Sequence, residues 1–148
     1  MTLYAKPEAI APCEKLLSVD HEILLRIVKT HHLDSDFGTL TTRVFHPSSK
    51  DDGKLSHFRN SKTSAQSVYN VVHNLNVKDL EGIWGLTISE IKQLGLRAID
   101  DSSCEMDPFN LGSHCYIDIR GLSLSRLDQK KLRADLLNAL QARGRVAP

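Results

Sequence analysis

The stretch from Ser113 to Gly121 reads Ser-His-Cys-Tyr-Ile-Asp-Ile-Arg-Gly, and from His114 to Arg120 it alternates between polar and apolar side chains. Successive side chains of a strand point to opposite faces of a sheet, so this pattern predicts a β-strand. One face would carry Cys115, Ile117 and Ile119, and the other His114, Tyr116, Asp118 and Arg120. We expect the first face to pack in the core and the polar face to meet solvent or a ligand.

Further strands are predicted on both sides of this stretch, where short apolar or β-branched runs are bounded by turn residues. These runs are residues 22–28, 39–46, 54–59, 82–87 and 96–99. The first run is apolar at five of its seven positions. A run of this kind is typical of a strand that is buried on both faces.

Helices are predicted from capping residues and apolar periodicity. They begin at Thr63 or Ser64, at the capping box Thr87-Ile-Ser-Glu90, and at Ser123 or Ser125, and the last one is long and ends at Gly144. Strands interspersed with two or three helices, with a closing C-terminal helix over the sheet, predict an α+β domain with a mixed or antiparallel sheet.

The length and composition predict one globular domain. A chain of 148 residues can bury a core without metal or disulfide support, and 41% hydrophobic with 25% charged residues is ordinary for such a domain. Residues 1–13, with Pro7 and Pro12, are expected to form an irregular N-terminal arm. No leader sequence or membrane-spanning run is recognisable, so we expect no membrane association.

The charge balance argues against nucleic acid as a partner. There are 19 basic and 18 acidic residues, which leaves no global field to attract a polyanion. Basic residues of the last helix, Lys130, Lys131 and Arg133, are the remaining candidates. A charged outer face is also the ordinary way to solubilise such a helix.

The cysteines favour a cytoplasmic location and argue against a metal site. Cys13, Cys104 and Cys115 are odd in number and form no CxxC pair, which is typical of free thiols in a reducing compartment. His114 and Cys115 would point to opposite faces of one strand and could not share an ion. We therefore expect no metal ion and no cofactor.

Arg26 is the most informative polar residue, since a guanidinium inside an apolar strand needs partners when it is buried. The partner could be an internal carboxylate such as Asp118, backbone carbonyls, or an anionic ligand. Snorkelling to the sheet edge is a further alternative.

A diffuse polar set could converge on one cleft if the segment 39–59 packs beside the strand at 114–120. Its candidate ligand-binding residues are Arg26, Arg43, Ser56, Tyr116 and Asp118, and its candidate acid–base residues are His114 and His57. A cation, a hydroxyl and an imidazole would suit an anionic or nucleotide ligand. The alternative is a solvated sheet face.

Four short motifs together resemble a pattern found in small uncharacterised bacterial proteins. They are Leu24-Leu-Arg26, Phe45-His-Pro47, Asp52-Gly-Lys-Leu-Ser56 and His114-Cys-Tyr-Ile117. The resemblance implies a bacterial single-domain protein without an assigned activity. More loosely, Arg26 followed by Ser56 is similar to the arrangement that holds NAD in ADP-ribosyltransferase folds, although the catalytic glutamate motif is missing here.

Two functions from different classes follow. The first is a binding or interaction module that acts through a protein partner or by self-association, because no catalytic signature is present and the arm can reach a neighbour. The alternative is a small enzyme that uses a nucleotide or NAD, with Arg26 as an anion clamp. A small anionic ligand would fit either one.

Overall fold

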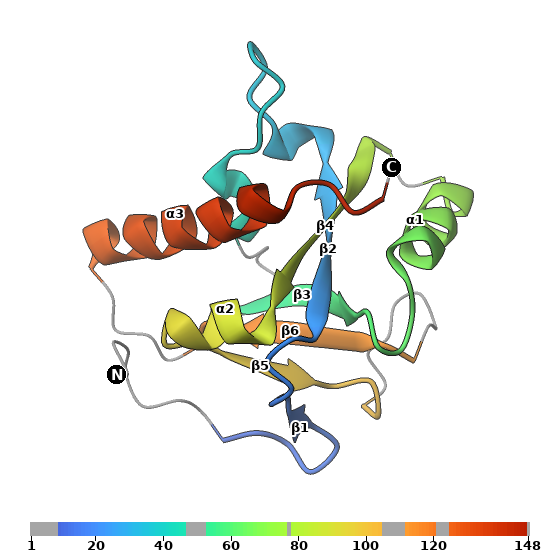
Figure 1. The fold of residues 1–148 in the computed structure, drawn as a ribbon, viewed down its shortest axis with the longest axis vertical. Helices are drawn as coiled ribbons and strands as arrows, with labels where there is room; N and C mark the ends of the chain where they lie inside the picture. Colours follow the sequence, from blue (N-terminus) through green and yellow to red (C-terminus); the bar gives the residue numbers. More distant parts are fainter. Residues whose placement is uncertain (1–8, 47–52, 77, 105–111, 121–124, 148) are drawn as a thin grey trace.

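The computed structural model describes residues 9–46, 53–76, 78–104, 112–120 and 125–147. Their central element is a six-stranded sheet in the order β1-β5-β6-β3-β2-β4, with every neighbouring pair antiparallel. The strands are β1 Lys15–Leu16, β2 Ile23–Lys29, β3 Lys54–Arg59, β4 Leu80–Thr87, β5 Arg97–Asp100 and β6 His114–Asp118. Figure 1 shows β2 and β4 crossing the direction of β3, β6 and β5, so the sheet is strongly twisted.

The helices begin at the capping residues that the sequence singles out. They are α1 Ala65–Asn74, α2 Ile88–Gln93 and α3 Arg126–Arg143, with N-caps Ser64, Thr87 and Ser125. The capping box is confirmed, because the Thr87 amide donates to Glu90 Oε1 at 2.8 Å and the Glu90 amide donates to the Thr87 hydroxyl at 3.1 Å. The alternative cap, Ser123, lies outside the described residues.

The α+β class is confirmed, with an antiparallel sheet and a long C-terminal helix. The helices α3 and α1 lie on opposite sides of the β2–β4 pair (Figure 1). The first core lies on the face that carries Leu24, Trp84, Cys115 and Ile117, where the leucines of α3 and the isoleucines of α2 pack. The second core lies on the opposite face, where Leu25, Phe58 and Ile83 pack against α1.

One predicted strand is wrong. The segment 39–46 contains a 3₁₀ helix, η2 Thr42–Phe45, in place of a strand. Its Thr41 hydroxyl accepts a hydrogen bond from the Arg43 amide, which starts a turn, and Val44 and Phe45 are fully buried in the first core. The β-branched composition of this run reflects burial against α3, which a strand propensity cannot distinguish from sheet pairing.

The prediction of three free cysteines is also wrong, because Cys13 and Cys104 form a disulfide across 91 residues of sequence. The register of the sheet explains the pairing. Lys15 pairs with Asp100, so the residues just before β1 lie beside the turn that follows β5. Cys115 remains a buried thiol in the first core, as its place on the apolar face predicts.

Residues 9–14 precede β1 without forming a helix or strand. The rest of the predicted arm, residues 1–8, lies outside the described residues. Among the helices that the structure describes, none has the length and apolar character required to cross a bilayer.

Candidate functional site

Arg26 serves the fold in this structure. Its Nε and Nη2 donate to the carbonyl of Val44 at 3.2 and 2.7 Å, and its Nη1 donates to the carbonyl of Ser56 at 2.7 Å. Of the alternatives for Arg26, backbone carbonyls are the ones observed. They tie η2 to the sheet and engage all three guanidinium nitrogens, which leaves the side chain poorly suited to clamp a ligand.

The alternative in which Arg26 pairs with Asp118 is not the one observed, and Asp118 binds two other arginines. Arg97 Nη2 lies 2.8 Å from Asp118 Oδ2, and Arg120 Nε lies 2.9 Å from Asp118 Oδ1. Burial alone would raise the pKa of Asp118, but the hydrogen bonds and charges of Arg120 and Arg97 outweigh it and lower that pKa. The carboxylate is therefore charged and fully engaged.

The polar set does not converge on one cleft, because its members occupy both faces of the sheet. Directly paired residues of an antiparallel ladder share a face. Ser56 pairs with Tyr116 on one face, whereas His57 pairs with Cys115 on the other. Arg26 pairs with Trp84, which lies in the first core with Cys115.

Two further candidates stand apart from any shared site. Arg43 is exposed on η2, where it donates to the Thr41 hydroxyl and to the Leu33 carbonyl. His57 is fully buried, and its Nδ1 lies 2.8 Å from the Leu55 carbonyl. Because a carbonyl only accepts, Nδ1 carries the hydrogen, and Nε2 has no hydrogen-bond partner within the described part of the chain.

The polar face of β6 is not the open surface that the sequence predicts. His114, Tyr116 and Asp118 are at most 6% exposed. The N-terminal arm and the ion pairs of Asp118 cover this face, and a shallow hollow of about 410 Å³ remains beside them. The residues around the hollow are Ala9, Ile10, Ala11, Cys13, Glu14, Lys54, Asp101, Cys104 and Arg120.

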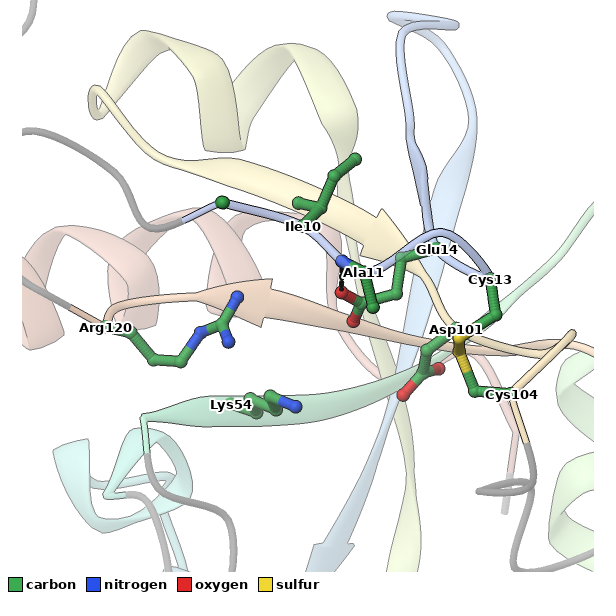
Figure 2. Close-up of a pocket in the computed structure, with 9 residues that line it drawn as sticks. Ile10, Ala11, Cys13, Glu14, Lys54, Asp101, Cys104 and Arg120 are labelled. Atoms are coloured by element: carbon green, nitrogen blue, oxygen red, sulfur yellow. Dashed lines mark hydrogen bonds between the residues drawn. A yellow bond between two sulfur atoms is a disulfide. The ribbon is translucent and has the colours of Figure 1, made fainter.

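The described part of the arm, taken here as residues 9–14, contributes a carboxylate to the lining of this hollow. Glu14 accepts hydrogen bonds from the Ala11 amide at 2.7 Å and from the Tyr116 hydroxyl at 2.5 Å. Figure 2 shows Lys54 and Arg120 extending from the sheet on the same side as the arm, with Glu14 between them and the disulfide. Burial alone would raise the pKa of Glu14, but Tyr116, Ala11, Lys54 and Arg120 together lower it.

Tyr116 organises the cations. The ammonium of Lys54 lies 5.1 Å from the centre of the Tyr116 ring, and the guanidinium carbon of Arg120 lies 5.4 Å from it. Arg120 Nη2 also donates to the Tyr116 hydroxyl at 3.1 Å. Burial and the hydrogen bond to Glu14 raise the pKa of Tyr116, which keeps the hydroxyl protonated as a donor. We call Lys54, Tyr116 and Arg120 the cationic seat.

A glycine allows the chain to approach this seat. Gly53 has a φ of +80°, in the left-handed region that favours glycine, and its carbonyl accepts from the Ile119 amide at 2.9 Å. A Cβ at Gly53 would lie 2.9 Å from Arg120 Cγ. The absence of a side chain at Gly53 therefore fixes where Arg120 sits.

An aspartate orients His114 at the other end of the hollow. His114 Nδ1 lies 2.6 Å from Asp101 Oδ1, and both side chains are 8% exposed. The carboxylate accepts, so Nδ1 carries the hydrogen and Nε2 is the basic nitrogen. The His114 ring meets the Phe58 ring edge to face. Such a pair is the arrangement that positions an imidazole for proton transfer.

Glu14, Lys54 and Asp101 are site residues that the sequence pattern does not predict, and Arg120 is predicted on the polar face of the strand without a role in the site. A sequence signal existed for Lys54 alone, since it alternates with Ser56 on a predicted strand. Glu14 and Asp101 lie outside the strands. Glu14 reaches the site through the pairing of β1 with β5, and Asp101 reaches it through the pairing of β5 with β6. Among the described residues, no three His, Cys, Asp or Glu side chains are grouped so as to hold a metal ion.

Comparisons with known proteins add no relative: no family model, curated protein or solved structure matches the chain. The function must therefore be argued from the site.

Proposed function

We propose that this protein is a binding module whose cationic seat receives an acidic side chain of a protein partner. The observation that carries the proposal is the contact between Glu14 and Tyr116. It is an internal example of a carboxylate that is hydrogen-bonded to Tyr116 and close enough to Lys54 and Arg120 for their charges to lower its pKa. Charge-assisted hydrogen bonds of this kind are stronger than those between neutral groups.

The surroundings of the hollow suit a polypeptide. Ile10, Leu16 and Val19 are 37%, 56% and 47% exposed, and all three lie on the segment that carries Glu14. Ile10 also lines the hollow. An exposed apolar side chain in the lining of the hollow, here Ile10, adds an aliphatic contact to a polar anchor, as in protein-binding patches.

The test uses a Glu14→Ala variant, which vacates the seat and leaves the disulfide intact. A capped Ala-Glu-Ala peptide is titrated into the ¹⁵N-labelled variant, with Ala-Gln-Ala as the uncharged control and inorganic phosphate as the non-peptide anion. The proposal predicts amide shifts at Lys54, Tyr116 and Arg120 with the glutamate peptide, and smaller ones with the glutamine peptide. The absence of shifts at these residues would refute it, and shifts with phosphate alone would point to a small anion instead of a protein.

A matched pair of lysine variants makes the assignment specific. Lys54→Gln in the Glu14→Ala background should weaken peptide binding by up to about fivefold, which corresponds to one exposed charge pair. Lys62→Gln removes an exposed lysine from the turn after β3 and should leave binding unchanged. Equal effects of both variants would show only a response to net charge.

A second candidate function, the nucleotide-using enzyme, is supported by the pair of His114 and Asp101. In this proposal Asp101 orients His114, which acts as the acid or base. The cations Lys54 and Arg120 bind the anionic group of the nucleotide, the role that the sequence analysis expected for Arg26. Saturating NAD at about 100 times its dissociation constant would stabilise the protein by about 2.7 kcal/mol. An unchanged melting temperature with NAD and with nucleotides would exclude this candidate.

A cytoplasmic location remains a proposal. Its original basis, three free cysteines, no longer holds. In that compartment a disulfide such as the one between Cys13 and Cys104 is usually transient and redox-responsive, whereas in an oxidising compartment it would be permanent.

A further inference from the structure

The hollow has one wall that is not part of the sheet. Its arm side consists of Ala9, Ile10, Ala11, Cys13 and Glu14, and its remaining lining residues belong to β3, to the end of β6 and to the turn after β5. If the arm moved away, the cationic seat would be open from that side.

Few contacts hold the arm in place. The strand β1 has only two residues, both exposed, and the backbone of this segment adds one hydrogen bond from the Leu17 amide to the Ala98 carbonyl. Among the described residues, the other attachments of this segment are the packing of Leu17 in the first core, the hydrogen bond from Tyr116 to Glu14 and the disulfide from Cys13 to Cys104. The disulfide is the only covalent one among them.

Glu14 is positioned as a tethered competitor for the seat. A group linked to its own binding site acts at an effective concentration in the millimolar range when the link is short. The disulfide shortens the link, because it fixes Cys13, the residue next to Glu14, to the turn beside the hollow. A partner's carboxylate must displace Glu14 before it can bind.

We infer that the arm is a redox-controlled latch: the disulfide between Cys13 and Cys104 holds Glu14 in the cationic seat, and its reduction opens the seat to the partner. The inference rests on the proposed function and adds its regulation. A thiolate of a dithiol reductant attacks one sulfur, and the other cysteine leaves as a thiolate that takes up a proton. The second thiol of the reductant then releases the first cysteine, so the reductant ends as a disulfide and the protein gains two thiols.

The accessibility of the two cysteines and the size of the hydrophobic cores favour a regulatory disulfide over one that is needed for folding. Both cysteines are only partly buried and line the hollow, where a reductant can reach them. The third cysteine, Cys115, is completely buried, and burial raises the pKa of its thiol well above the usual value, so it cannot compete in the exchange. The two cores lie within the sheet and its helices, and a chain of this length does not need a disulfide to fold.

The test compares the wild-type protein with a Cys13→Ser/Cys104→Ser variant that keeps Glu14. Hydrogen exchange is followed at the amides of Ala11 and Glu14, which are hydrogen-bonded within the arm, and at the amides of β2 and β6. We expect the arm amides to lose protection while the strands stay protected. We also expect the Ala-Glu-Ala peptide to bind the double cysteine variant 5- to 150-fold more tightly than it binds the oxidised wild type. This is the usual range for the coupling between two sites.

Two control variants and one substitute for the double variant complete the test. Cys115→Ala removes a cysteine without touching the latch and should change neither readout. Asp20→Asn removes an exposed carboxylate near the arm and should not raise affinity. If the double variant fails to fold, wild-type protein treated with dithiothreitol replaces it, and alkylation under native conditions should then modify two cysteines and not three.

The two proposals fail in different ways. Arm amides that stay protected after reduction, or peptide affinity that does not rise while the Glu14→Ala variant binds, would overturn the latch alone. An arm that is released while neither the reduced protein nor the Glu14→Ala variant binds the peptide would overturn the binding function, and the latch as a regulator with it.

Discussion

The Tyr116 hydroxyl donates a hydrogen bond of 2.5 Å to the Glu14 carboxylate, which is 102 residues away in the sequence. The contact joins the interior strand β6 to the segment before the edge strand β1, across the intervening strand β5. It places a negative charge of the arm beside Tyr116, where the charges of Lys54 and Arg120 lower the pKa of Glu14, and so makes the arm part of the site.

Removing the Tyr116 hydroxyl should destabilise the protein. Tyr116→Phe keeps the ring beside both cations and deletes the donor to Glu14, so we expect a loss of about 1.5–3 kcal/mol, the range for a hydrogen bond to a charged group. Urea unfolding at neutral pH measures it. Tyr69→Phe, on the partly exposed surface of α1, should cost less than about 0.5 kcal/mol, and equal losses would show that the contact with Glu14 contributes nothing.

An ion-pair network that the sequence analysis missed should dominate the electrostatics of the fold. Arg59 donates to Glu22 at 2.7 and 2.9 Å and to Asp100 at 2.7 Å, with the three side chains 16%, 5% and 10% exposed. Arg59→Met leaves two buried carboxylates without their cation, so we expect a loss of about 3–5 kcal/mol in the free energy of unfolding.

A surface pair provides the comparison for this network. Lys92 and Asp20 lie 2.8 Å apart but are 49% and 67% exposed. Lys92→Met should cost less than about 1 kcal/mol, because solvent screens exposed pairs. A loss at Arg59 as small as that at Lys92 would show that the network is effectively hydrated.

The stability of the fold should fall as the pH drops from 6.5 to 5. Burial, together with nearby Arg26, lowers the pKa of His57 to about 3, and burial with the neighbouring positive charges lowers the pKa of His32 to about 3. Both side chains stay neutral in the folded state, while the unfolded chain takes up protons below about pH 6.5. Each histidine therefore removes about 2 kcal/mol of stability by pH 5.

Denaturant unfolding at several pH values between 5 and 7.5 checks this slope. We expect His57→Gln to reduce the slope of the free energy of unfolding against pH by about half. This holds even if the substitution also changes the stability at pH 7.5. His73→Gln, on the exposed surface of α1, controls for the loss of a histidine. A slope that His57→Gln leaves unchanged would mean that His57 is protonated within the folded protein.

The contact between Gly53 and Arg120 should be sensitive to a single methyl group. Gly53→Ala adds a Cβ that would lie 2.9 Å from Arg120 Cγ, at a φ of +80°. Gly112→Ala is the matched control, since Gly112 has a φ of +64° and nothing within 4 Å of the added atom. In both variants we expect the free energy of unfolding to fall by about 1–2 kcal/mol, because alanine is strained in the left-handed backbone conformation. In the Glu14→Ala background, we expect Gly53→Ala to weaken peptide binding as well, because it displaces Arg120, and Gly112→Ala to leave binding unchanged. An unchanged affinity of the Gly53→Ala variant would show that Arg120 does not contribute to peptide binding.

The sequence predicts the local elements well where one physical signal decides them. The alternation in 114–118 predicts β6, and the box of Thr87 and Glu90 predicts the start of α2, because both depend on neighbouring residues alone. The segment 39–46 is predicted wrongly, since the burial of Val44 and Phe45 against α3 overrides its strand propensity.

The site could not be predicted in the same way, because strand order assembles it. Pairing of β1 with β5 brings Glu14, Cys13 and Cys104 together, and no local pattern announces a two-residue edge strand. The apolar run around Arg26 predicts that its guanidinium needs partners, and the half-buried side chain has them. The sequence does not predict that these partners are backbone carbonyls, because the Val44 carbonyl reaches Arg26 only through the packing of η2.

The pKa of Glu14 decides whether the cationic seat attracts a carboxylate. Its side-chain carboxyl is titrated by ¹³C NMR in the oxidised wild-type protein and in Lys54→Gln and Tyr116→Phe variants. We expect a pKa below the usual glutamate value in the wild type, and a higher pKa in both variants because each loses a group that favours the carboxylate. An ordinary pKa in the wild type, or a lowered one that neither variant changes, would show that the seat does not attract a carboxylate.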